Sequence, residues 1–449
     1  MKTSVLPNNS VKMIGRYRAA RQQTLALCEP LTPEDMMVQS CPEASPSKWH
    51  LAHTAWFFES FVLREFLSGY RLFDPDYPWL FNSYYRSFAA FPEKRLRASF
   101  SRPGLEVVLS YRKHVDGAVE RLLSHDPDPE AVRRIELGIQ HDEQHQELLL
   151  TDILHAFSTN PLRPAYLPGG LEAAPRGPGT EIPIPPLAFV EYPGGMYETG
   201  YAGDGFCYDN ELPRHRIWLE KFALANRLVT CAEYAAFIAD GGYNRPELWL
   251  SAGWDAIQEH NWRAPLYWSG SDDRRTVFTL RGELPLSRVK DTPVSHISFF
   301  EADAYARWAG CRLATELEWE VAAEKHPIQG NLLHTERLLP APLASSDPSS
   351  VAKQSTPDHP GNGAAPAPAE IAQLFGDCWE WTSSAYLGYP GFKAPEGALG
   401  EYNGKFMSGQ MVLRGGSCVT PSEHIRSSYR NFFAPETRWQ FSGIRLAVV

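Results

Sequence analysis

Two histidines, His141 and His145, lie four residues apart inside a segment with helical periodicity, residues 129–157. At 3.6 residues per turn they share one helix face, so both imidazoles can bind a single metal ion. In the zinc-protease motif HExxH a glutamate directly follows the first histidine, whereas Asp142 holds that place here. The spacing therefore predicts a metal site and disfavours a metalloprotease.

A second pair, His50 and His53, lies three residues apart in the strongly apolar segment 46–67. An imidazole that faces an apolar interior needs a polar or metal partner, so one of the two is a candidate third ligand. For at least one of them we expect a capping or surface position. Three neutral imidazoles suit Zn, Fe(II), Cu or Ni, and ligand type alone does not choose. His114 and His155 are weaker candidates that we expect to face solvent.

Aromatic residues cluster beside polar ones at two further places. Tyr84 and Tyr85 lie in a long connection, roughly residues 68–104, and near a metal they could donate a proton or hydrogen atom. Residues 429–433 (YRNFF) place a carboxamide beside aromatic rings, which is a platform for a flat or cationic ligand. The alternative for both clusters is ordinary aromatic packing in the core.

The elements that must position these residues divide into two kinds. Residues 1–160 contain four helical segments, which predict an antiparallel four-helix bundle. Residues 161–186 are rich in Pro and Gly and are typical of a linker. Residues 187–449 alternate short apolar runs with Gly-rich turns, with helical patterns only near 231–238, 300–309 and 316–323. We expect an α+β protein of two domains, with a mobile low-complexity insertion at 340–370.

Composition narrows the class of protein. The 449 residues carry a formal net charge of −10, with 43% hydrophobic and 21% charged residues, which excludes a disordered chain. Mild acidity argues against nucleic acid or an anionic membrane as a partner. The chain shows no run of about 18 apolar residues and no signal-peptide core, so we expect a cytoplasmic protein. Seven cysteines without a CxxC pair disfavour a disulfide framework or Cys-rich zinc site.

Several motifs resemble known families. LFGDCWEWTSSAY (374–386), VLRGGSC (412–418), YRNFF (429–433) and SGIRLA (442–447) resemble the formylglycine-generating-enzyme fold, a variant of the C-type-lectin fold, over about 189–449. WHLAH (49–53) and HDEQHQELLLTDILHAF (141–157) resemble the DinB-like four-helix metal bundle. The two in this order resemble the ergothioneine-biosynthesis sulfoxide synthases over nearly the whole chain.

This resemblance implies a non-haem Fe(II) enzyme that uses O2 to join a thiol to C2 of the hercynine (trimethylhistidine) imidazole, leaving a sulfoxide. It implies that His53, His141 and His145 hold the iron and that His50 is not a ligand. It also implies that hercynine contacts Gln144, Asn431 and Phe432. Tyr84 and Tyr85 match the paired tyrosines of one branch, and Tyr402 is a weaker alternative.

The resemblance also bears on the sulfur donor. Family members that use γ-glutamylcysteine have an acidic residue directly after the Asn-aromatic pair and an arginine shortly beyond. Phe433 occupies the acidic position here, which favours cysteine itself. Its carboxylate needs a cation, and Arg86, Arg97 and Arg102 are candidates, each of which could equally be surface charge. The expected partners are therefore small molecules.

Other functions remain open at this point. A selenoneine synthase, which joins a selenosugar to hercynine, shares the length and both domains. A DinB-type metal-dependent thiol S-transferase would explain three histidines but leave the C-terminal domain idle, and a lectin-like domain could simply bind a ligand. Formylglycine generation is disfavoured, because its two cysteines would fall at Thr420 and Ile425.

Overall fold

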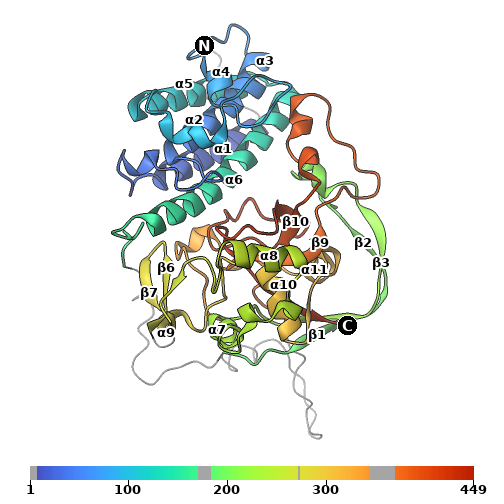
Figure 1. Ribbon diagram of the computed structural model, residues 1–449. Helices are drawn as coiled ribbons and strands as arrows, with labels where there is room; N and C mark the ends of the chain where they lie inside the picture. The colour runs from blue at the N-terminus through green and yellow to red at the C-terminus, as the bar shows by residue number, and fades with distance from the viewer. Residues whose placement is uncertain (1–7, 170–183, 272–273, 344–369) are drawn as a thin grey trace, which may run out of the picture.

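The structure is a computed structural model that describes residues 8–169, 184–271, 274–343 and 370–449. Residues 170–183 of the expected linker and 344–369 of the expected insertion lie outside the described residues. Figure 1 shows a helical N-terminal domain packed against a mixed C-terminal domain. The predicted α+β class with two domains is confirmed.

The N-terminal domain is the predicted four-helix bundle. Asp128 caps the last helix by accepting a hydrogen bond from the Glu130 N–H. A short helix, α4 (Tyr77–Leu80), interrupts the long connection that follows the second helix. The bundle helices are α1 (Asn8–Ala26), α2 (Ser47–Phe58, continued by a π-helical turn Glu59–Leu63 and α3, Arg64–Phe66), α5 (Leu105–Leu123) and α6 (Pro129–Thr159).

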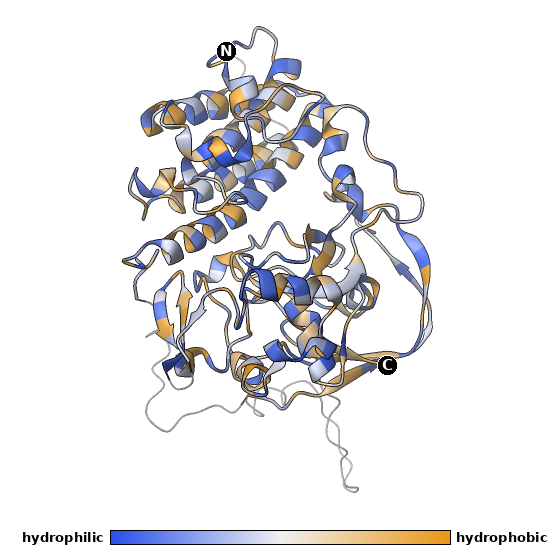
Figure 2. Cartoon of the chain, in the orientation of Figure 1, coloured by the Kyte–Doolittle hydropathy of each residue, from blue (hydrophilic) through white to orange (hydrophobic). Residues whose placement is uncertain are grey.

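Helix α2 lies at the centre of this domain, and all twelve of its residues are buried. It packs against both α5 and α6. A Cβ on Gly138 of α6 would lie 2.4 Å from the Phe58 ring, so glycine permits the close approach of α6 to α2. Figure 2 shows hydrophobic and hydrophilic residues mixed along the bundle helices, as expected where the outer helices bury one face. This packing brings the histidines of α2 and α6 together.

The C-terminal domain contains two small four-stranded sheets. One has the order β1-β4-β13-β8 and is antiparallel throughout. The other has the order β11-β10-β9-β12, with β12 parallel to β9. The strands of the first are Phe189–Tyr192, Phe222–Ala225, Leu446–Val448 and Arg312–Leu313. Those of the second are Asn431–Phe433, Met411–Arg414, Trp379–Ala385 and Ser442–Gly443.

Short helices and two further strand groups complete this domain. The three predicted helices are present, and each begins with a capping box at Thr230, Ser298 or Thr315. They are α7 (Cys231–Ala239), α10 (Phe299–Trp308) and α11 (Glu316–Ala323). The sequence analysis missed α8 (Ser251–Glu259), α9 (Leu286–Val289), the hairpin β2 (Gly195–Thr199) and β3 (His215–Leu219), and the sheet β5 (Trp268–Ser269), β6 (Thr276–Thr279) and β7 (Gly282–Pro285).

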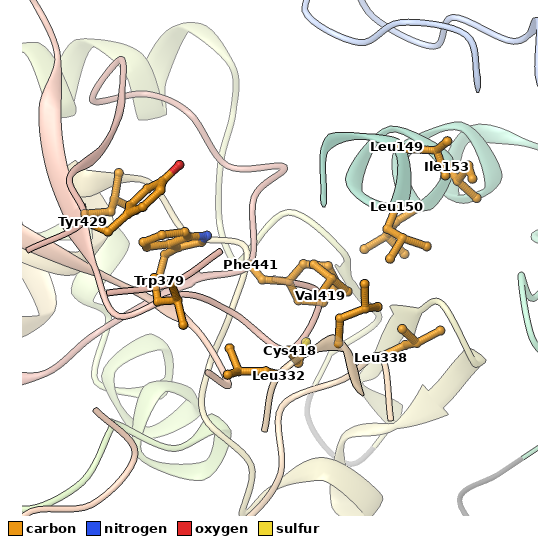
Figure 3. Packing of buried hydrophobic residues seen from close by; sticks show 14 of the residues in the cluster. Leu149, Leu150, Ile153, Leu332, Leu338, Trp379, Cys418, Val419, Tyr429 and Phe441 are labelled. Carbon is orange, nitrogen blue, oxygen red and sulfur yellow. The ribbon is translucent and has the colours of Figure 1, made fainter. Parts of the chain in front are cut away.

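Helix α6 forms the boundary between the two domains (Figure 1). Leu149, Leu150 and Ile153 of α6 belong to one hydrophobic cluster with Val419 and Phe441 of the C-terminal domain (Figure 3). Because this core is continuous, the two domains are held in a defined relative position. Among the described residues, no helix combines the length and the apolar character needed to cross a membrane.

Candidate functional site

Three histidines converge between α2 and α6. His53 comes from α2, and His141 and His145 come from α6, and one ligand atom from each lies within 4.8 Å of the others. Burial lowers the pKa of all three, that of His141 to about 3. They are therefore neutral at physiological pH, which is the form that binds a metal. Within the described residues, His141 Nδ1 is buried without a hydrogen-bond partner. The donor set fits a divalent transition metal.

The orientation of the His53 imidazole is set by its surroundings. Its Nδ1 lies 2.7 Å from the carbonyl oxygen of Phe81, which can only accept, so Nδ1 carries the proton. Its ring stacks on Trp49, with centroids 4.4 Å apart, and on Trp56, at 5.1 Å. Nε2 is thereby left with the lone pair that a metal requires.

His50 is not one of the three converging histidines. We expected a capping or surface position for at least one of His50 and His53, and this is wrong, because their side chains are 2% and 1% exposed. His50 Nδ1 lies 2.7 Å from His145 Nδ1, and His50 Nε2 lies 3.0 Å from Asp152 Oδ2. His114 and His155 lie outside the site, where they contact the Arg71 carbonyl oxygen and the Ser40 hydroxyl.

The histidines open onto a cavity of about 440 Å³ between the two domains. The helical domain contributes the metal-site face, and the C-terminal domain contributes loops and β11. Aromatic rings and amides make up much of the cavity wall, and they include Tyr84, Gln144, Tyr208, Tyr402, Asn403, Phe406, Tyr429, Asn431 and Phe432.

Gln144 is held in one orientation by a chain of hydrogen bonds. Its Nε2 donates to Tyr429 Oη at 2.8 Å, and its Oε1 accepts from the Tyr402 hydroxyl. Tyr429 Oη also lies 3.0 Å from His424 Nε2, and His424 Nδ1 lies 2.8 Å from Gln140 Oε1. Because Gln140 Oε1 can only accept, His424 carries its proton on Nδ1 and accepts the Tyr429 hydroxyl. His424 was not predicted from the sequence. Tyr429 was noted as the first residue of the YRNFF motif, but its hydrogen bond to Gln144 was not predicted.

Asn431 and Phe432 line the cavity from strand β11. Phe432 stacks on Tyr386 with centroids 4.0 Å apart and 9° between the rings. The guanidinium of the buried Arg430 lies 5.1 Å from the centre of the same Tyr386 ring and donates to both oxygens of Glu316. Tyr386 is thus packed between Phe432 and a paired cation.

The two predicted tyrosines occupy different environments. Tyr84 lines the cavity, whereas Tyr85 is fully buried against Trp56 and Phe61, with its hydroxyl 3.4 Å from that of Tyr84. Burial raises the pKa of Tyr84 to about 12, and the pKa values of Tyr85 and Tyr402 are raised as well. All three hydroxyls therefore keep their protons at neutral pH.

Two residues of the C-terminal domain hold the backbone of the Tyr84 loop. Glu401 accepts hydrogen bonds from the N–H groups of Arg86 and Ser87, at 3.1 and 2.9 Å. Lys405 donates to the Tyr84 carbonyl oxygen at 2.7 Å and pairs with Glu401. The loop is thus attached to the opposite domain.

Of the three candidate arginines, the structure brings only Arg97 to the cavity. Arg97 is 5% exposed, donates to Ser45 Oγ at 2.8 Å, and lies 3.4 Å above the Trp49 ring. Burial lowers its pKa to about 9, an effect that Asp152 partly offsets, so it remains a cation. Arg86 and Arg102 are exposed and are not among the residues that line the cavity, which agrees with the alternative that they are surface charges.

Phe433, Trp439 and Gln440 also line the cavity, and the Phe433 and Trp439 rings lie 6.0 Å apart. Gln440 is 1% exposed, and no described residue accepts a hydrogen bond from its Nε2. The indole N–H of Trp439 is likewise buried and unpartnered within the described chain. The sequence analysis missed both residues, which carry no local motif. These N–H groups suit a ligand with acceptor atoms.

Comparison with known proteins agrees with this architecture. A DinB superfamily model matches residues 16–149, and a sulfatase-modifying factor enzyme 1-like domain model matches residues 183–449. A hercynine oxygenase of Mycolicibacterium smegmatis is 34% identical over 95% of this chain and 96% of its own length. One of Mycobacterium tuberculosis is 32% identical over 95% of this chain and 96% of its own. Ergothioneine biosynthesis protein 1 of Schizosaccharomyces pombe is 28% identical over 54% of this chain and 27% of its own.

The expected relationship to the ergothioneine-biosynthesis sulfoxide synthases is thereby confirmed, since both domain models match in the predicted order and the full-length relatives are oxygenases. The chain belongs to the hercynine oxygenase family.

Proposed function

We propose that this protein is an Fe(II)-dependent sulfoxide synthase that joins cysteine to C2 of the hercynine imidazole. The observation that supports this most directly is the convergence of His53, His141 and His145, buried and neutral, on a cavity between the two domains. The relatives are named hercynine oxygenases, which supports hercynine and O2 as substrates.

The reaction balances with these reactants alone. The thiol loses one hydrogen, the imidazole loses the hydrogen on C2, and a C–S bond forms. One oxygen atom of O2 becomes the sulfoxide oxygen, and the other leaves as water with the two hydrogens. When bound to the three histidines, Fe(II) would supply the redox chemistry for O2 and acidify the thiol.

The hercynine side of the cavity is assigned from its chemistry. A trimethylammonium group has no hydrogen-bond donor, so it is held by ring faces and carbonyl oxygens. Phe432 and Asn431 provide these groups on β11, and Gln144 presents an amide that its two tyrosine partners orient. These residues would place the imidazole beside the histidines and supply proximity.

Tyr84 is the proposed proton donor, because its hydroxyl lies at the cavity and keeps its proton at neutral pH. Tyr85 would act behind it through their hydroxyl contact. Tyr402 is the alternative donor, since it also lines the cavity, and its ring lies 5.9 Å from that of His141.

Arg97 is the buried cation that would pair with the donor carboxylate, and Lys94, which also lines the cavity, is exposed to solvent. Gln440 and Trp439 provide two unpartnered N–H groups within the described residues. Phe433 offers nothing to the extra ammonium and carboxylate of γ-glutamylcysteine, and desolvating them against a phenyl ring is costly. A selenosugar carries no carboxylate for Arg97. Cysteine therefore matches the cavity best.

The test is anaerobic reconstitution with Fe(II), followed by O2 uptake and product analysis with saturating hercynine and either cysteine, γ-glutamylcysteine or a selenosugar. We expect kcat/KM to be highest for cysteine and the product to be its hercynyl sulfoxide. Preference for the selenosugar would identify a selenoneine synthase. Zn binding with thiol transfer and no O2 uptake would indicate an S-transferase, and absence of metal binding would indicate a ligand-binding protein.

A further inference from the structure

Outside the three converging histidines, the structure contains a second buried titratable pair, His50 and Asp152. Their side chains are 2% and 8% exposed, and they come from α2 and α6. His50 lies between His145 and Asp152 and has one ring nitrogen within hydrogen-bond distance of each. Neither residue is assigned a role by the proposed reaction.

The carboxylate of Asp152 ends the hydrogen-bond chain His145–His50–Asp152, and it sets the direction of each bond. Asp152 Oδ2 accepts the backbone N–H of Ser45 at 2.8 Å, so this oxygen is acting as an acceptor. It lies 3.0 Å from His50 Nε2, which must therefore carry a proton. With its Nε2–H directed at Asp152, His50 has Nδ1 as the ring nitrogen that can accept a hydrogen bond.

The hydrogen bonds of His50 also fix the ring of His145 at the metal site. His50 Nδ1 lies 2.7 Å from His145 Nδ1, and two lone pairs at that distance would repel each other. His145 Nδ1 must therefore donate, and its lone pair must be on Nε2. His53 is held in the matching form by the Phe81 carbonyl oxygen. His141 differs, since its Nδ1 has no partner among the described residues.

We propose that Asp152 and His50 act as a positioning pair. They hold His145 as the tautomer with the proton on Nδ1, whose Nε2 lone pair is directed at the metal. This inference rests on the proposed metal site. The pair fixes the ring orientation before the metal arrives, and the charge of Asp152, transmitted through His50, makes His145 a better electron donor. His50 is a positioning residue, because it acts through His145.

The pair also adjoins the donor side of the cavity. Ser45, which donates its N–H to Asp152, accepts at Oγ from the guanidinium of Arg97. Asp152 and Arg97 both line the cavity. A substitution here must therefore be read out on the metal itself, so that effects on donor binding are not mistaken for effects on the ligand.

The experiment compares His50→Phe with His50→Gln by anaerobic Co(II) titration, using the visible absorbance of the bound ion. Phenylalanine fills the space but can neither donate nor accept, whereas glutamine can accept from His145 and donate to Asp152. We expect His50→Phe to weaken Co(II) binding about 10- to 100-fold, and His50→Gln to restore most of that loss. Asp152→Asn, which keeps shape but removes charge, should give a smaller loss and provides a second route if His50→Phe does not fold.

The tautomer of His145 can be measured directly alongside the titration. In histidine-selective 15N spectra of the metal-free protein, we expect His145 to be protonated at Nδ1 in the wild type and to lose that preference in His50→Phe. His155→Phe is the matched control, because His155 also lies on α6 but contacts Ser40, away from the cavity. The Co(II) affinity of this variant should equal that of the wild type.

The outcomes separate the two proposals. If the wild type does not bind Co(II) or Fe(II), the proposed function fails. If the wild type binds and His50→Phe binds equally well, the positioning pair is wrong while the metal site stands. If His50→Gln is as weak as His50→Phe, the hydrogen-bond chain is not what supports His145, and the proposal is also overturned.

Discussion

The indole N–H of Trp379 donates a hydrogen bond to the carboxylate of Glu147 across the domain boundary, with an N–O distance of 2.6 Å. Trp379 begins β9, and Glu147 follows the metal-site residues on α6. The same carboxylate accepts from Ser417 and Thr420, both at 2.9 Å. Since β10 joins β9 to β11, this contact holds α6 in register with Asn431 and Phe432. One buried side chain thus aligns the two halves of the cavity.

The first prediction concerns this alignment. Glu147→Leu removes the acceptor for three buried donors, and each buried donor left without a partner costs about 1–3 kcal/mol. We expect a loss of roughly 3 kcal/mol or more in unfolding free energy, with smaller losses for Glu147→Gln, which keeps one acceptor oxygen. Urea denaturation of the metal-free protein measures both. Equal midpoints for wild type and Glu147→Leu would show that the contact does not stabilise the interface.

The second prediction concerns the metal ligands. His53→Ala, His141→Ala and His145→Ala should each lose Fe(II) binding and turnover while keeping the helical circular dichroism of the bundle. Because an ion that binds only the native state stabilises it, anaerobic Fe(II) should raise the Tm of the wild type but not of these variants. A variant among the three that retains stoichiometric iron and full activity would remove that residue from the ligand set.

The third prediction concerns the proton donor. Tyr84→Phe should reduce sulfoxide formation about 10²-fold or more, while iron and hercynine binding survive, and should divert cysteine towards its sulfinic acid. Tyr85→Phe should have a smaller effect, because Tyr85 does not line the cavity. Tyr402→Phe should instead raise the KM for hercynine, since Tyr402 holds Gln144. If Tyr402→Phe rather than Tyr84→Phe changes the product ratio, the proton donor is misassigned.

The fourth prediction concerns the donor carboxylate. Arg97→Met should raise the KM for cysteine roughly 10- to 100-fold, the usual loss for one charged hydrogen bond, with kcat less affected. Arg86→Met is the matched control, because Arg86 is exposed and outside the cavity. Co(II) titration should show unchanged metal affinity in both variants. A normal KM for cysteine in Arg97→Met would place the carboxylate elsewhere.

The fifth prediction concerns the attachment of the Tyr84 loop. Burial would raise the pKa of Glu401, but hydrogen bonds from Ser87, Lys405 and the Arg86 N–H lower it to about 2. A lowered pKa means that the attachment is complete above about pH 4.5 and is lost only as the pH falls towards 2. We therefore expect Glu401→Gln to lower kcat by a similar factor at every pH between 6 and 9, without loss of iron. If the loss of kcat in Glu401→Gln changes with pH between 6 and 9, Glu401 is not the ionised anchor of the Tyr84 loop.

The sequence by itself determined the parts of this protein that depend on local periodicity. The helix period of 3.6 residues located the bundle, and the spacing of His141 and His145 placed two imidazoles on one face. The family resemblance singled out His53, which the structure brings to them. The strands of two to four residues were not predictable, because they are too short to show a period and form through pairing with distant strands.

Only the tertiary structure decided which residues share the cavity. Sequence could not choose among three arginines or separate Tyr84 from Tyr85, because the burial of each side chain depends on which distant segments pack over it. His50 was misplaced for the same reason: α2 is buried on every side, so no solvent face exists to receive a polar residue. Contacts such as Gln144 with Tyr429, 285 residues apart, depend on how the two domains pack, which no local pattern encodes.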